Sequence, residues 1–165
     1  MGCSLAAGPV AFVLVFAGCG GGGGGDDDGG IDAPPSAACQ EATTYQELAT
    51  IETKIFKPSC VFSGCHNGAA TPQGMMDIRE TKAFTHLVNV DSKVSTDNRK
   101  VVVPGDPESS YMMIMIGEIA PGDATPPGSP PPTTIGFMPQ NAGSLLCNEK
   151  REAIKRWITA GAQDN

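Results

Sequence analysis

The chain has few aromatic residues and no cluster of basic residues. Phe, Tyr and Trp make up 5% of its 165 residues, so we expect a thin apolar core that a large prosthetic group or a disulfide would help to stabilise. Asp and Glu outnumber Lys and Arg by 18 to 11, which gives a net charge of −7 and argues against a nucleic-acid partner. The sequence also lacks a Ser-His-Asp pattern, a phosphate-binding glycine loop and paired carboxylates, so a hydrolase is unsupported.

The first 18 residues have the features of an export signal. Leu5 to Ala17 is almost wholly apolar but shorter than the roughly 20 residues of a comfortable membrane span. It ends in Val15-Phe-Ala-Gly-Cys19, which resembles the bacterial lipobox, the site that is cut before a lipid-modified cysteine. We therefore expect residues 1–18 to be a lipoprotein signal peptide and Cys19 to be lipidated. The protein would then be anchored by its lipid in a bacterial cell envelope, on the periplasmic side or the outer surface.

Residues 19–38 have the composition of a flexible tether. Gly20 to Gly25 and Asp26 to Gly30 offer no side chain to bury. The alternative is an inert tail on a freely secreted protein. Residues 39–165 have the length of one domain, and export implies an oxidising compartment in which cysteines can pair.

Four helices separated by long loops rich in Pro and Gly are predicted for this domain. We expect them over residues 44–57, over 81–90, from Ser109 or Ser110 through Ile116, and over 148–160. The apolar residues of each recur at helical spacing. No alternating strand pattern or internal repeat accompanies them, so the predicted fold class is all-α.

The ends of the predicted helices carry recognisable signals. Thr44 and Glu47 match a capping box at the start of the first helix, and Pro58 is expected to end it. Gly161 is placed to stop the last helix. The stretch from Pro121 to Thr134 holds six prolines, which precludes a helix or a central strand. On the last helix we expect an apolar face and a solvent-facing side, the latter formed by Lys150, Arg151, Lys155 and Arg156.

The most informative stretch is Cys60-Val-Phe-Ser-Gly-Cys65-His66. Two thiols can add to the vinyl groups of a haem, and a histidine directly after the second thiol can ligate the iron. The usual motif has two residues between the cysteines, whereas this one has four. Both thiols would still reach one haem if residues 62–64 loop outward, with Gly64 tolerating an unusual backbone angle.

Two other interpretations of these residues stay open. Cys60 and Cys65 would form a small-loop disulfide in a domain that binds no haem. Alternatively, they would bind zinc together with His66 and His86, although the paired spacing of a zinc ribbon is absent.

The order of the motifs resembles that of small class I cytochromes c, most closely the cytochrome c-like domains of exported and lipid-anchored bacterial proteins. The resemblance covers about residues 44–162. It rests on the cysteine–histidine motif followed by Val103-Pro-Gly-Asp-Pro-Glu-Ser-Ser-Tyr111, then Met138-Pro139, and then Trp157-Ile-Thr-Ala-Gly-Ala162.

The resemblance implies one covalently bound haem c. Cys60 and Cys65 would hold its thioethers, His66 would be the proximal iron ligand, and Met138 the distal ligand, with His86 as the second candidate for the sixth position. A histidine–methionine pair raises the reduction potential of the iron. The protein would be an electron carrier, not an enzyme, and would bind other redox proteins transiently.

In cytochromes of this kind the terminal helices pack across each other, which implies a disulfide between Cys39 and Cys147. Closing a loop of this size stabilises a fold by up to ~4–5 kcal/mol in the chain-entropy model. A disulfide also supports the alternative function, a haem-free, cytochrome-like lipoprotein that acts as a structural or binding module.

Overall fold

The computed structural model describes residues 34–61, 65–68, 76–140 and 142–165. The signal peptide, Cys19 and the tether up to residue 33 lie outside these ranges, as do residues 62–64, which were expected to loop outward. The helices are α1 (Ala37–Ala42), α2 (Leu48–Ile51), the π-helical η1 (Glu52–Phe56), α3 (Lys57–Ser59), α4 (Ala83–Leu87), α5 (Tyr111–Met115), the 3₁₀ turn η3 (Pro121–Asp123) and α6 (Asn148–Thr159).

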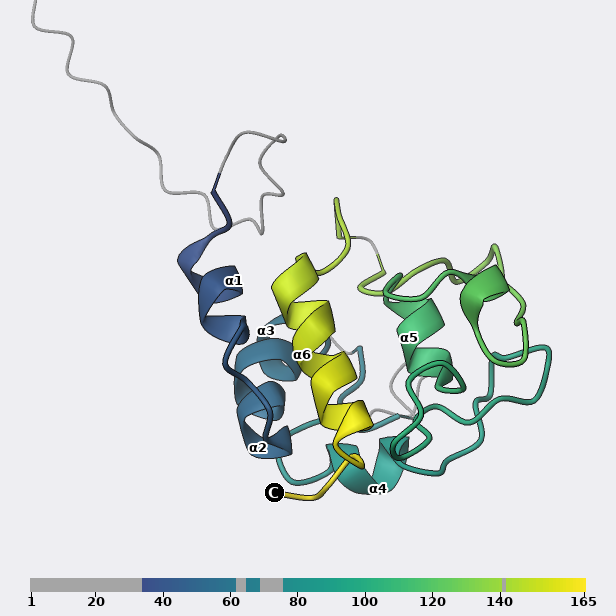
Figure 1. Ribbon diagram of the computed structural model, residues 1–165, viewed down its shortest axis with the longest axis horizontal. Helices are drawn as coiled ribbons and strands as arrows, with labels where there is room; N and C mark the ends of the chain where they lie inside the picture. The colour runs from purple at the N-terminus through teal and green to yellow at the C-terminus, as the bar shows by residue number, and fades with distance from the viewer. Residues whose placement is uncertain (1–33, 62–64, 69–75, 141) are drawn as a thin grey trace, which may run out of the picture.

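The described part of the domain is helical with long loops, which confirms the predicted class (Figure 1). Extended residues pair only in three isolated bridges, Asn67 with Asp77, Val88 with Val102 and Asp91 with Lys100, and build no sheet within the described ranges. None of the helices described has the length and apolar character that crossing a membrane requires.

The first predicted helix begins later than expected, and a separate helix precedes it. Thr44 completes α1, because its N–H and its hydroxyl both donate to the carbonyl of Glu41, at 3.2 and 2.9 Å. Its side chain is therefore not available for the predicted capping box. The next helix starts after Glu47, whose side chain makes no capping hydrogen bond.

Pro58 does not end this helix, contrary to the prediction. The helix continues through the wide π turn η1 into α3, where Pro58 lies in the first turn. Pro58 directly follows the π turn, in which the N–H of Lys57 donates to the carbonyl of Glu52. Cys60 and Val61 then both donate their N–H to the carbonyl of Phe56, at 2.7 and 3.1 Å, and the helix ends at the cysteine.

The first of the two middle helices is shorter than predicted because its end pairs with an extended residue, whereas α5 agrees with its predicted bounds to within one residue. The helix expected to reach Val90 stops at Leu87, whose carbonyl accepts the N–H of Val102 at 3.1 Å. Ser110 precedes α5 as expected, but its hydroxyl donates to the carbonyl of Asp106 at 2.7 Å instead of capping the helix. This bond holds the Val-Pro-Gly-Asp turn.

Helix α6 crosses the middle of the domain, between α1 to α3 on one side and α5 on the other (Figure 1). Its bounds agree with the prediction to within one residue, and Gly161 follows it with a φ of +99°. Trp157 is buried, and its indole N–H donates to the carbonyl of Gln163 at 2.9 Å. The predicted apolar face, Ala153, Ile154, Trp157 and Ile158, is fully packed.

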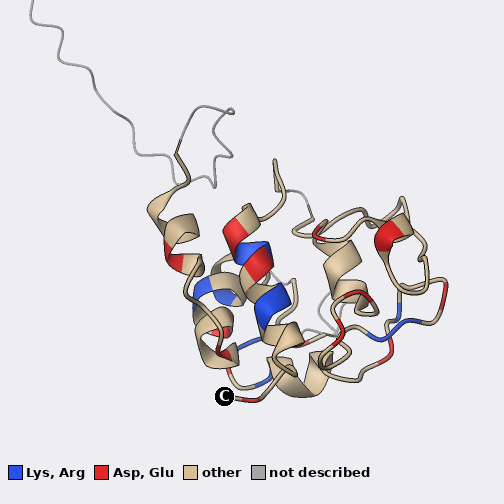
Figure 2. Cartoon of the chain, viewed as in Figure 1, with Lys and Arg blue, Asp and Glu red and all other residues tan. Residues whose placement is uncertain are grey.

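The other side of α6 faces solvent only in part, and the prediction was wrong for Lys150. Lys150 is 4% exposed. Arg151 and Lys155 form ion pairs with the buried carboxylate of Glu118, at 3.6 and 3.2 Å. Arg156 donates to the carbonyl of Ala42, at 2.7 Å. The basic side chains of α6, blue in Figure 2, therefore bond the helix to α1 and to the segment after α5.

Candidate functional site

The cysteine–histidine motif begins where α3 ends. Cys60 is the residue after the last turn, and its carbonyl accepts the N–H of His66 at 3.0 Å. Asn67 in turn donates to the carbonyl of Cys65 at 2.7 Å. Although five residues separate Cys60 from His66 in sequence, the hydrogen bond holds these two ends of the motif side by side.

Both cysteines of the motif are thiols that are not joined to each other, and both are half-buried. The sulfur of Cys60 packs against the apolar core. Burial, with a smaller contribution from Cys65, raises the pKa of Cys60 to about 12 against the opposing effect of Lys150. The thiol of Cys60 is therefore neutral at neutral pH, and it lies within electrostatic reach of Cys65 and of a cation on α6.

The segment after the motif is fixed by its pairing with residues 77–79. The carbonyl of His66 accepts the N–H of Ile78 at 3.0 Å, so the main chain of this histidine is bonded on both sides. Gly68 has a φ of +74°, and a Cβ there would lie 2.8 Å from a carboxylate oxygen of Asp77, so only glycine fits. Arg79 donates two hydrogen bonds to that carboxylate, at 2.9 and 2.7 Å, and holds the pKa of Asp77 at about 2.

Met138 lies on the loop that follows the proline-rich stretch. Its side chain is half-buried and packs against the core, and its N–H donates to the carbonyl of Met115 at 2.7 Å. This bond attaches the loop to the last residue of α5. The stretch before it is irregular, as predicted, except for the single 3₁₀ turn η3.

Sequence reasoning missed the residue that holds this proline-rich loop. Arg99 is 7% exposed, and its guanidinium donates to the carbonyls of Pro126 and Glu108 and to the carboxylate of Asp97. An arginine in a polar turn gives no sign in the sequence that it is buried. Only the position of the loop, which supplies the carbonyl acceptors, accounts for it.

The proposed zinc ligands do not come together. His86 is half-buried on α4, where its charge lowers the pKa of Asp77. Among the described residues, one set of three His, Cys, Asp or Glu side chains has its ligand atoms close together, namely Cys39, Cys147 and Glu149. Its two sulfurs are joined to each other, so they are not available to a metal. The structure therefore gives no support to a zinc site at Cys60, Cys65, His66 and His86.

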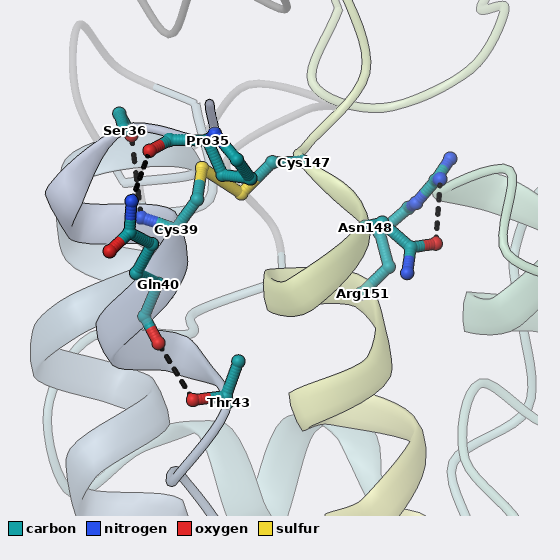
Figure 3. The surroundings of a disulfide bond; sticks show 8 residues. All are labelled: Pro35, Ser36, Cys39, Gln40, Thr43, Cys147, Asn148 and Arg151. Atoms are coloured by element: carbon teal, nitrogen blue, oxygen red, sulfur yellow. Dashed lines mark hydrogen bonds between the residues drawn. A yellow bond between two sulfur atoms is a disulfide. The ribbon is translucent and has the colours of Figure 1, made fainter. Parts of the chain in front are cut away.

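Cys39 and Cys147 form a disulfide, which is the pairing that the resemblance implied (Figure 3). The bond joins α1 to the residue that precedes α6, and the two Cα atoms are 6.2 Å apart. Around it, Ser36 accepts the N–H of Cys39 at 3.3 Å and so caps α1. The disulfide therefore links the two ends of the domain.

A cavity of ≈ 440 Å³ lies beside the motif. Its lining includes Val61, which belongs to the motif, and four charged side chains: Lys57, Arg79, Glu80 and Lys82. Lys57 and Glu80 form an exposed ion pair at 2.9 Å. The surface next to the cysteines is therefore charged, with more basic than acidic groups.

Comparison with protein-family models, with curated proteins and with solved structures found no significant match.

Proposed function

We propose that this protein transfers electrons outside the cytoplasm by means of one covalently bound haem c, in a cytochrome c-like domain held at a membrane by a lipid on Cys19. The observation that carries the proposal is the hydrogen bond from the His66 N–H to the Cys60 carbonyl, at 3.0 Å. It compensates for the long spacing of the motif, because it holds the histidine beside the first cysteine.

The chemistry of the donor set fits this group. Cys60 and Cys65 are unjoined thiols, which thioether formation requires, and His66 directly follows the second. Met138 supplies a soft thioether sulfur from a loop that α5 and Arg99 hold in place. When bound, the haem would supply a one-electron redox change at its iron.

The roles of the chain's own residues follow from this donor set. Cys60 and Cys65 would hold the haem covalently, and the imidazole of His66 and the sulfur of Met138 would bind its iron. If His66 and Met138 both bind the iron, they would leave it no site for a substrate, so the protein would be a carrier and not an enzyme. Its partners would be other redox proteins that dock transiently.

The alternative is a haem-free module that the disulfide stabilises. The described core supports it, because the largest side chains in the core are buried and Cys39 is joined to Cys147. The two proposals differ in the state of Cys60 and Cys65, which would pair with each other in the module once it is exported.

The haem content of the exported protein distinguishes them. We expect protein made in a host with haem-attachment machinery to be coloured and to give a pyridine haemochrome spectrum of the thioether type. The variant Cys60→Ser/Cys65→Ser, with the Cys39–Cys147 disulfide kept, should be exported without covalent haem. Colourless wild-type protein in which mass spectrometry finds Cys60 bonded to Cys65 would contradict the electron-carrier proposal.

A further inference from the structure

The surface around Met138 differs from the rest of the molecule in its lack of charge. Residues 124–148 contain no Lys, Arg, Asp or Glu. At the chain's average of 18% charged residues, a stretch of 25 residues would contain between four and five of them. In Figure 2 the described residues of this loop are tan from the end of η3 to the start of α6.

Phe137 stands at the exposed part of this loop. Its side chain is 45% exposed, and no other large apolar residue in the described ranges is exposed. Ile135 and Met138, on either side of it, are half-buried and pack against the core. The main chain is fixed by the bond from Met138 to Met115, so the loop presents the phenyl ring from a held position.

Charged groups contact this stretch near its two ends, since Arg151 donates to the Oδ1 of Asn148 at 3.4 Å and the others lie at its first residues. Arg99 is buried and forms an ion pair with Asp97 at 3.1 Å, and both contact the loop only between Pro126 and Ser129. Glu108 accepts the hydroxyl of Thr125 at 3.0 Å. These contacts leave the stretch from Ile135 to Gln140 without a charged partner among the interactions described.

We propose that residues 135–140, centred on Phe137, form the docking surface for the redox partner, and that this partner contributes an uncharged, apolar patch. An aromatic side chain at the centre of a contact is typical of the residues that dominate binding energy. A charged group of the partner would lose its hydration against this loop and gain no counter-charge. The inference rests on the proposed function, because it takes Met138 as the iron ligand beside which the partner docks.

Electrodes coated with monolayers of different chemistry test this directly on the haem-loaded protein. Electron transfer should be fastest on a film ending in methyl and hydroxyl groups. The variant Phe137→Lys should slow it at least about tenfold, because a lysine must then be desolvated at the contact. Gly122→Lys is the matched control, since Gly122 is exposed and a side chain there meets no atom within 4 Å. It should change the rate less than about twofold.

The cationic cavity lined by Lys57, Arg79 and Lys82 offers the competing site. Fastest transfer of the wild type on a carboxylate-terminated film, unaffected by Phe137→Lys, would assign docking to that cavity and overturn the proposal. Sedimentation of the wild type and of Phe137→Ser tests whether this surface binds a second copy of the chain instead of a redox partner. A dimer that the variant loses would also overturn it.

Retention on a phenyl matrix separates this inference from the proposed function, because it needs no haem. Purified full-length protein should elute measurably later than Phe137→Ser whether or not it carries haem. If the electrode shows no current but this difference remains, the electron-carrier function fails and the redox partner with it, while Phe137 remains an exposed apolar contact. Equal retention of the two proteins would overturn the docking surface itself.

Discussion

The two parts of this domain are held by different kinds of contact. Around α6, apolar burial and a covalent bond accompany the ion pairs: Trp157 and Leu48 are 1% exposed, and a disulfide joins α1 to the start of the helix. Around the motif the contacts are main-chain hydrogen bonds and ion pairs, such as those of His66 and Asp77. Burial of large side chains contributes more to stability than exposed polar contacts do. The domain is therefore stabilised mainly by its terminal helices. The candidate ligands lie on segments that contribute less to its stability.

Removing the disulfide should have the largest effect on stability. The double variant Cys39→Ser/Cys147→Ser frees a loop of about a hundred residues in the unfolded chain, and its free energy of unfolding should fall by about 2–5 kcal/mol. Denaturant unfolding of the oxidised proteins measures this difference.

The haem content per folded molecule should stay unchanged in this double variant, because Cys39 and Cys147 are not in the motif. Unchanged stability would mean that apolar packing alone holds α1 and α6 together. Loss of haem from protein that still folds would mean that the two parts depend on each other more closely than their contacts indicate.

A smaller effect is expected at Glu52, which connects the two parts. It is 5% exposed, and its carboxylate accepts the N–H groups of Thr81 and Ala83, at 2.9 and 3.2 Å, just where α4 begins. In Glu52→Gln an amide group faces one of these donors, which should cost about 1–3 kcal/mol of unfolding free energy.

The matched control for this substitution is Glu47→Gln. Glu47 is exposed and its side chain makes no capping bond, so its substitution should change stability by less than about 0.5 kcal/mol. Equal effects in thermal or denaturant unfolding would show that the carboxylate of Glu52 does not hold the start of α4.

The sequence predicted the apolar part of this structure better than the polar part. The limits of α6, its buried face and the helical class follow from periodicity, because apolar burial dominates there. Helix α1, the passage of Pro58 and the burial of Arg99 were not predicted. The burial of Arg99, for example, depends on the backbone carbonyls of Glu108 and Pro126, which residues later in the chain supply. Composition and spacing do not show where such carbonyls will be.

In the candidate site, too, the sequence predicts one part and not the other. The motif gives the residue types, but the bond from His66 to Cys60 and the pairing of residues 66–68 with 77–79 come from the fold. The same holds for Lys150, which the helical pattern placed in solvent and which is buried close enough to Cys60 to affect its pKa.

The smallest effect on stability, together with a large spectroscopic change, is expected at Met138. In Met138→Leu a half-buried side chain is replaced by one of similar volume, so the cost should be below about 1.5 kcal/mol. If the Met138 sulfur binds the iron, the oxidised variant should lose the weak far-red sulfur-to-iron band and its reduction potential should fall.

Met112→Leu is the control, because Met112 is also half-buried and packs against the same core. It should match the stability change and leave the band and the potential as they are. An unchanged spectrum in Met138→Leu would assign the sixth position to His86 instead. It would also contradict the conclusion that the loop after the proline-rich stretch carries a ligand.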